Sequence, residues 1–206
     1  GNGNVSANIT TNGSTAGALT VNSSNFSVGG TIDLRADGDV TLNTPIVTSS
    51  VANGTGSTKT AVTLVAGQAL NAGDSSGGNV KITGAGNITV GTDGVAAIYS
   101  GSIVGTTSTS GMAPSGSGKF RYNSDETTTN YTKTLSQSNG TSINGVSVIY
   151  REAPEIQVTA NSTATGVLTY NGLVQTDPNA GVTNNLTVAG VLKNSDSTSL
   201  AGTVDL

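Results

Sequence analysis

Three carboxylates lie close together near the start of the chain, and paired carboxylates are the groups that cleave polysaccharides. Asp33, Asp37 and Asp39 fall in one short stretch. A glycosidase needs two carboxyl groups held roughly 5 to 10 Å apart across a cleft. We expect Asp33 to lie on a different wall or corner from the later pair, and a similar segment downstream lacks all three acids. A solvated face is therefore the preferred interpretation, and a carbohydrate-active enzyme is the alternative.

A second group of chemically versatile residues lies between residues 119 and 154, where the densest charges coincide with aromatic side chains. Such a group can bind sugars, because aromatic rings stack on sugar faces. Alternatively, these residues form surface ion pairs that fix the end of a repeated structure. Each such exposed pair contributes under about 1 kcal/mol to stability. We prefer the ion pairs and keep a surface-binding patch as a candidate site. Its predicted members are Arg121, Tyr122, Asp125, Glu126, Tyr131, Arg151 and Glu152.

The residues that the chain lacks exclude several kinds of chemistry. It has no cysteine and no histidine, which excludes thiol nucleophiles, disulfides, thiolate or imidazole metal ligands and histidine-based triads. Calcium-loop patterns are also absent, so we predict no catalytic residue, no metal and no cofactor. The net charge of −4, without any basic run, predicts no nucleic-acid partner. No apolar stretch approaches the roughly 18 residues of a membrane span, so no membrane insertion is predicted.

The composition favours β-structure around a narrow core. Charged residues make up 10% of the chain and aromatic residues 3%. These values are too low for a charge-rich disordered chain or a thick globular core. Valine and threonine are frequent and there are only 4 prolines, which favours extended structure over helix. We therefore predict an all-β chain whose core is built from small side chains.

The segment 29–44 recurs at 77–92 and provides the main structural signal. Each copy predicts a short alternating strand, a polar corner with glycine and a second strand. Together with a looser copy at 61–73, the spacing predicts two coils of roughly 20 to 28 residues each in a stacked β-solenoid. The copies align at an offset of 48 residues, and their matched apolar pairs are Ile32 with Val80, Leu34 with Ile82, Val40 with Ile88 and Leu42 with Val90.

Loop signals divide the chain into two predicted domains. Residues 48–59 and 105–118 are polar and of low complexity, and we expect exposed excursions there. Residues 1–150 are predicted to form a parallel β-helix shaft. Pro154 disfavours a continued ladder, so residues 151–206 are predicted to form a small β-rich module that is truncated, with continued coils as the alternative. Because the first residue is glycine and not methionine, we expect a piece of a longer protein.

Several segments carry a family resemblance. GGTIDLRADGDVTLNTPI (29–46) and GGNVKITGAGNITV (77–90) resemble coils of the filamentous-haemagglutinin-like exoproteins, large bacterial adhesins exported by two-partner secretion. RYNSDETTTNYTKTL (121–135) and VIYREAPEIQVTA (148–160) are similar to the stretch where the shaft of these proteins meets an array of glycine-rich, mostly-β (MBG) modules. LKNSDSTSLAGTVDL (192–206) resembles part of such a module.

This resemblance implies a right-handed parallel β-helix that is secreted or carried on the bacterial cell surface. It also implies an outer-membrane secretion partner and a glycan or protein receptor on a host cell or in a matrix. We therefore expect an adhesin or extracellular-matrix segment that acts as a rigid scaffold without catalysis. Besides the enzyme, a self-assembling filament subunit, joined end to end or laterally, is an alternative.

Asn-x-Ser/Thr sequons are frequent, for example at Asn8, Asn87, Asn161 and Asn185. They accept sugars only where a glycosylating system meets them. A chain this rich in asparagine, serine and threonine contains many of them by chance.

Overall fold

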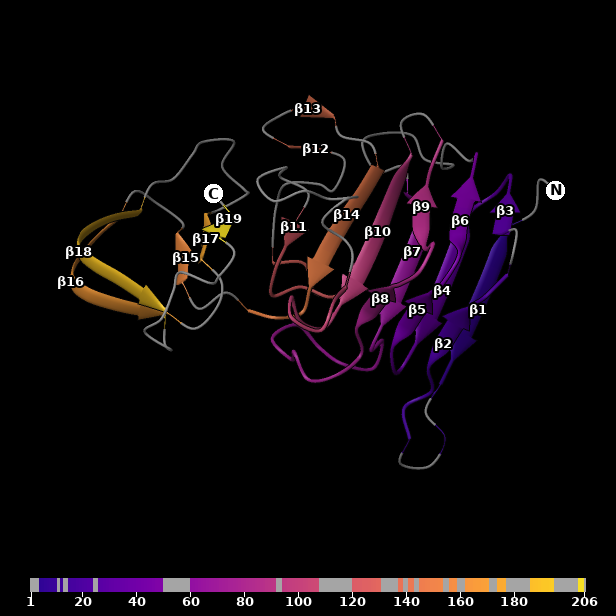
Figure 1. Ribbon diagram of the computed structural model, residues 1–206, viewed down its shortest axis with the longest axis horizontal. Coiled ribbons are helices and arrows are strands. Elements are labelled where there is room, and N and C mark those ends of the chain that lie inside the picture. The colour runs from indigo at the N-terminus through magenta and orange to yellow at the C-terminus, as the bar shows by residue number, and fades with distance from the viewer. Residues whose placement is uncertain are drawn as a thin grey trace.

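The computed structural model describes residues 4–49, 60–107, 120–130 and 145–153, except residues 11, 13, 14, 24, 25, 92 and 93. In the remainder it describes only the backbone of short strands within 137–142 and 156–205. These residues form strands β1 to β19 and no helix (Figure 1). The predicted all-β fold is therefore confirmed for the described chain.

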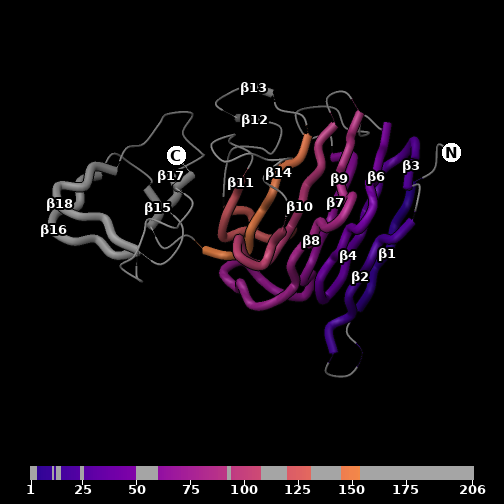
Figure 2. Tube along the Cα trace, viewed as in Figure 1, coloured from indigo at the N-terminus to yellow at the C-terminus, as the bar shows by residue number. Residues whose placement is uncertain are grey.

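Strands β1 to β11 and β14 form three parallel sheets in the part of the chain before residue 151 (Figure 2). The largest is six-stranded, in the order β1 (Val5–Ile9), β4 (Ile32–Ala36), β7 (Thr60–Ala66), β10 (Val95–Ser100), β14 (Gly145–Tyr150) and β11 (Phe120–Arg121). The second contains β2 (Leu19–Val21), β5 (Val40–Leu42) and β8 (Val80–Ile82), and the third contains β3 (Phe26–Val28), β6 (Pro45–Thr48) and β9 (Asn87–Thr89). From β1 to β9 the chain enters the three sheets in rotation, so each strand pairs with one from an earlier or later round.

Alternation along each strand places apolar side chains in columns that run across the sheets. One column of the six-stranded sheet contains Leu34, Leu64, Ile98 and Val148, which lie opposite one another in successive strands. All four are at most 2% exposed. Burying each such side chain contributes about 1.5 to 3 kcal/mol, and the period of two along a strand fixes which residues face inward.

The predicted repeat corresponds to real strands, but its two copies do not occupy the same sheets. Ile32 lies opposite Val62 of the looser copy, whereas Val80, which the alignment matches with Ile32, lies opposite Val40. The first copy forms β4 and β5, whereas the second forms β8 and β9, so the copies are displaced by one sheet. The repeat encodes a strand–corner–strand unit, and the lengths of the intervening segments decide which sheet each copy enters.

The end of the six-stranded sheet departs from sequential order. Strand β14 lies between β10 and β11, although β11 precedes it in the chain. The rings of Phe120 and Tyr122 stack on Tyr150, with centroids 6.2 and 5.6 Å away. Tyr122 and Tyr150 are 4% exposed and belong to the apolar core. These aromatic side chains close the apolar columns at this end of the sheet.

The central strands of the six-stranded sheet are buried on both faces. Val65 and Ile149 occupy outward positions, yet both are 0% exposed, and Ala97 is 2% exposed. Strands buried on both faces have nearly continuous apolar sequences, as in the segments AVTLVA, VAAIY and VSVIY. Alternation alone did not predict this second buried face.

The strands after residue 153 also pair in parallel. β15 (Ile156–Val158), β17 (Val174–Thr176) and β19 (Val204–Asp205) form one sheet, and β16 (Ser162–Tyr170) and β18 (Leu186–Asn194) form another. Earlier in the chain, the short strands β12 (Gln137–Ser138) and β13 (Thr141–Ser142) instead form an antiparallel pair. The predicted boundary between residues 150 and 151, with a separate module after it, stays a prediction.

Candidate functional site

Arg151 is the centre of the predicted patch, and its side chain is buried. It is 1% exposed, and its guanidinium donates only to main-chain carbonyls in the hydrogen bonds resolved among the described residues. Nε donates to Asp74 O at 3.1 Å and Nη2 to Gly77 O at 2.7 Å; Nη2 also reaches Gly78 O at 3.1 Å, and Nη1 donates to Ala66 O. Burial lowers the pKa of Arg151, the charge of Asp74 opposes this, and the guanidinium remains charged.

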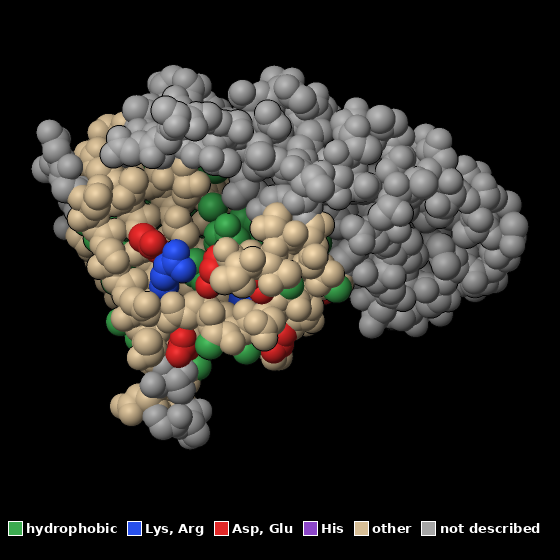
Figure 3. Space-filling model, turned by 180° about the vertical axis from the view of Figure 1, so that it is seen from behind, with side chains coloured by type: hydrophobic (Ala, Val, Ile, Leu, Met, Phe, Trp, Pro, Cys, Tyr) green, Lys and Arg blue, Asp and Glu red, His purple; other side chains and the backbone are tan. Residues whose placement is uncertain are grey.

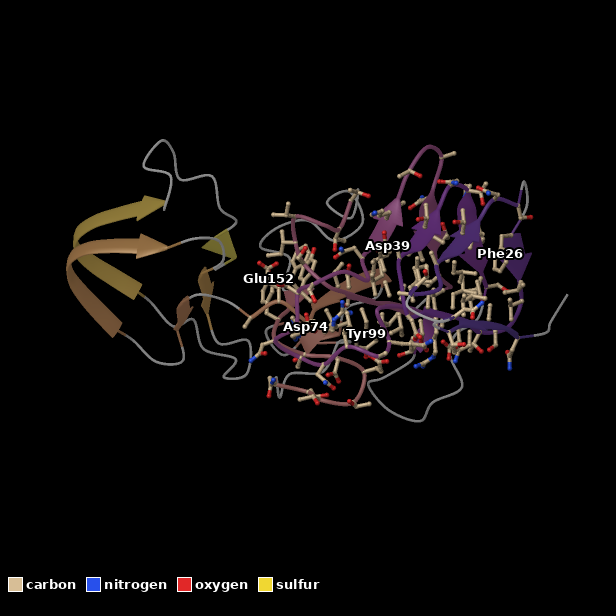
Figure 4. The ribbon with its side chains drawn as sticks, turned by 90° about the horizontal axis from the view of Figure 1, so that it is seen from below. Phe26, Asp39, Asp74, Tyr99 and Glu152 are labelled. Carbon is tan, nitrogen blue, oxygen red and sulfur yellow. The ribbon has the colours of Figure 1, made fainter. Side chains whose placement is uncertain are left out.

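The main chain on either side of Arg151 ties further segments to the same corner. Arg151 N donates to Ser100 O at 2.9 Å, and Gly73 N donates to Arg151 O at 2.8 Å. Glu152 adds a carboxylate, whose Oε2 accepts a hydrogen bond from Ile103 N at 2.7 Å. Figure 4 shows Asp74 and Glu152 at the end of the parallel sheets that is far from Phe26. Residues 151–152 therefore join the corners after β7 and β10.

Asp125 is the second buried charge of the patch, at 3% exposed. Its Oδ1 accepts from Thr127 N and Thr127 Oγ1 at 2.7 and 2.8 Å and from Thr128 N. Its Oδ2 accepts from Ala72 N at 2.7 Å. Burial raises the pKa of Asp125, but these hydrogen bonds outweigh it and hold the pKa below its usual value.

The remaining members of the predicted patch differ from one another in their burial and in their partners. Arg121 is 1% exposed and donates from Nη1 to Phe120 O at 2.7 Å, and Tyr122 lies in the aromatic stack. Glu126 Oε1 lies 3.9 Å from Arg35 Nη1; burial raises the pKa of Glu126, and the charge of Asp125 adds to this. Tyr131 lies outside the described residues.

The structure thus assembles these residues into a corner cluster, defined here as Arg121, Tyr122, Asp125, Glu126, Arg151 and Glu152. The side chains of Arg121, Tyr122, Asp125 and Arg151 are at most 4% exposed. A ligand in solvent cannot contact side chains buried to this extent while the corner keeps this conformation. The chemical role that the geometry supports is structural, because the buried charges satisfy main-chain groups that would otherwise lack partners.

The glycines around Arg151 are part of the cluster that the sequence did not reveal. A Cβ atom on Gly67 would lie 2.7 Å from Arg151 Nη2, and one on Gly101 would lie 2.9 Å from the same atom. Gly67 also has φ of +69°, a backbone conformation that favours glycine. The guanidinium therefore occupies space that side chains at these positions would fill. The only sequence signal for these contacts was a glycine next to a corner. Because glycine is common throughout this chain, that signal did not single out Gly67 or Gly101.

The acidic stretch near residue 35 does not form a pair of free carboxylates. Asp33 Oδ1 lies 2.8 Å from Arg35 Nε, and Asp39 Oδ2 lies 2.6 Å from Lys81 Nζ. Burial raises the pKa of Asp39, but hydrogen bonds from Asn79 N and Lys81 lower it further than burial raises it. Basic and acidic side chains also lie next to one another on the face in Figure 3. Asp37 lies in the backbone bend that directly follows β4.

Two further features of the described residues bear on metals and membranes. No group of three or more histidine, cysteine, aspartate or glutamate side chains in them could hold a metal ion. Within the same residues, no helix has the length and apolarity needed to cross a membrane.

Acidification should weaken the fold through Asp125. Its folded-state pKa lies below the unfolded value, so its stabilising contribution is present above about pH 4 and is lost as the pH falls through the folded-state pKa. We expect Asp125→Asn to lower the free energy of unfolding at pH 6 and to reduce its change between pH 6 and pH 3. Urea unfolding at both pH values measures this. An equally steep pH dependence in Asp125→Asn and the wild type would contradict the assignment.

In comparisons with known proteins, the chain matches no protein-family model, no curated protein and no solved structure.

Proposed function

We propose that this chain is a non-enzymatic, rigid scaffold segment, a right-handed parallel β-helix from a secreted bacterial surface adhesin or extracellular-matrix protein. The observation that carries the proposal is the parallel register of β4 with β7, β5 with β8 and β6 with β9. These pairs belong to three different sheets that the chain visits in rotation. A chain that adds one strand to each sheet per round builds along a single axis.

The mechanical consequence follows from this arrangement. Each round adds about 4.8 Å along the axis, with ladder hydrogen bonds in three sheets and a continuous apolar core. The column Leu34, Leu64, Ile98 and Val148 crosses four rounds and is almost fully buried. Bending such a rod would open ladder bonds on one side and compress packed side chains on the other. The proposed role is therefore to hold binding surfaces at a fixed distance.

The placement of charges favours a scaffold over an enzyme. Asp33 and Asp39 are each paired with a base, and Asp125 accepts several hydrogen bonds from main-chain N–H groups. A glycosidase instead needs two carboxyl groups facing one another across a cleft. The sequence resemblance to filamentous-haemagglutinin-like exoproteins supports the location on the bacterial surface and a glycan or protein receptor.

Electron microscopy and solution scattering of the purified chain over a range of concentrations test the scaffold. We expect short rods whose length does not change with concentration. Long fibres at high concentration would favour a self-assembling subunit, and a helix-dominated circular dichroism spectrum would contradict the β-helix. Adherence of cells that display or lack the intact protein, measured on host cells and matrix components, tests the adhesin role.

A polysaccharide panel tests the absence of catalysis. We expect no turnover by the wild type or by a variant carrying Asp33→Asn, Asp37→Asn and Asp39→Asn. Turnover by the wild type that disappears in this variant, with an unchanged circular dichroism spectrum, would establish the enzyme instead.

A further inference from the structure

Sequons are more frequent than composition explains. The chain has 21 asparagines, and 11 of them stand in Asn-x-Ser/Thr sequences with no proline at x. Serine and threonine together number 58 of 206 residues, so chance placement gives about six sequons. The excess raises the question of whether the fold presents them to solvent.

The structure separates sequon asparagines from most others by exposure. The sequon residues that it describes are all exposed: Asn4, Asn8, Asn12, Asn22, Asn87 and Asn130. Among the described asparagines outside sequons, Asn43, Asn79 and Asn123 are half-buried, and Asn71 is exposed. Asn71 is thus an exposed asparagine without the sequon, which makes it a natural control.

The amide groups of four sequon asparagines are also oriented alike. Asn4 Oδ1 accepts from Thr31 N at 2.9 Å, and Asn87 Oδ1 accepts from Ile88 N at 2.8 Å. Because these partners are main-chain donors, the acceptor must be the oxygen, which fixes the position of Nδ2. Asn8 and Asn22 likewise accept through Oδ1, from Gln68 and Asn43.

The amide nitrogens of these four residues make no comparable hydrogen bond with the described residues. Among the described residues, none of the four Nδ2 atoms donates a hydrogen bond, whereas Asn130 Nδ2 donates to Asn123 O. The oxygen is therefore held by the protein, whereas no described residue accepts a hydrogen bond from the nitrogen.

The sequons lie in strands or directly next to them. Asn8 is in β1, Asn22 directly follows β2, and Asn87 begins β9. In β9, Asn87 and Thr89 are exposed and Ile88 between them is buried. An enzyme can therefore reach the asparagine and the hydroxyl from the same outer face.

We infer that the sequon asparagines Asn4, Asn8, Asn22 and Asn87 are acceptors for N-linked sugar. The donor is a sugar whose anomeric carbon is bonded to a diphosphate leaving group, and a transferase brings it to the exposed asparagine. Nδ2 forms the bond to the anomeric carbon, the bond from that carbon to the phosphate oxygen breaks, and the diphosphate leaves with the electron pair. The amide proton passes to a base of the transferase, and nothing is oxidised or reduced.

Mass spectrometry of the intact protein isolated from the cells that make it tests the inference. We expect sugar on peptides containing these sequons. Asn87→Gln and Thr89→Ala should each lower the mass by the sugar carried at Asn87, whereas Thr89→Ser, which keeps the sequon, and Asn71→Gln should not. Wild-type peptides without sugar at all four positions, or sugar on Asn71 or on hydroxyl groups alone, would overturn it.

A second arm identifies the donor. Inhibiting the first step of lipid-linked sugar assembly removes the modification if the diphosphate is carried on a polyprenyl lipid. Modification that persists under the inhibitor assigns a nucleotide sugar instead. Both results assign the same acceptor nitrogen, and because the mass measurement does not depend on rod shape or adherence, its failure would leave the scaffold proposal intact.

Discussion

Replacing Arg151 with methionine should lower the free energy of unfolding by about 3 to 5 kcal/mol. The guanidinium donates to the carbonyls of Ala66, Asp74, Gly77 and Gly78. Methionine replaces the aliphatic stem of arginine but has no donor, and each buried acceptor left without a partner costs about 1 to 3 kcal/mol, part of which water recovers. Arg151→Lys should lose less, because an ammonium can still donate to some of these carbonyls. Urea unfolding followed by far-ultraviolet circular dichroism measures the loss.

Arg35→Met is the matched control for this prediction. Arg35 also carries a guanidinium, which pairs with Asp33 and lies 3.9 Å from Glu126, but its side chain is 32% exposed. Surface pairs of this kind contribute under about 1 kcal/mol. Equal losses in Arg35→Met and Arg151→Met would show that the buried hydrogen bonds are not what makes Arg151 important. An unchanged slope of the free energy with urea is needed for the comparison.

The adjacent residues Gly77 and Gly78 should respond very differently to alanine. Both have positive φ, at 75° and 57°, so alanine costs about 1 to 2 kcal/mol at either position through backbone conformation. A Cβ on Gly77 meets nothing within 4 Å, whereas one on Gly78 would contact Gly67 Cα and lie 2.5 Å from Gly67 N. Main-chain atoms cannot rotate away, so we expect Gly78→Ala to lose about 2 to 5 kcal/mol in total.

The difference in stability between the two alanine variants measures the energetic cost of the close contact between the corners. Thermal and urea unfolding of both proteins, purified in parallel, gives the difference directly. Losses that agree within about 0.5 kcal/mol would mean that backbone conformation alone matters at both positions. Such a result would also weaken the account of Arg151, since the same corners hold its carbonyl partners.

The sequence alone determined the secondary structure class and much of the core. The alternation in 29–44 predicted inward positions for Ile32, Leu34, Val40 and Leu42, and all four are at most 2% exposed. This was possible because a strand exposes alternate residues to opposite faces, so pattern and burial are linked locally.

Pairing was decided by the tertiary structure. The alignment of the two copies matched Val80 with Ile32, but Val80 lies in the sheet that contains Val40 and opposite that residue. A parallel strand pairs with a partner from another round of the chain, and the segment lengths between rounds vary. The position of β14 between β10 and β11 has the same origin. Similar apolar patterns fit any of the three sheets, so the sequence pattern did not specify which one.

The corner cluster shows most clearly which features the sequence reveals and which only the tertiary structure reveals. The sequence placed charged and aromatic residues near both ends of 121–152 and predicted a role at the end of the repeat. Only the structure shows that Arg151 is buried and that its partners are main-chain carbonyls within 66–78. Main-chain carbonyls are present at every residue and leave no trace in the sequence. The residue types at the corner were therefore readable in advance, whereas their burial depended on which corners the fold brought together.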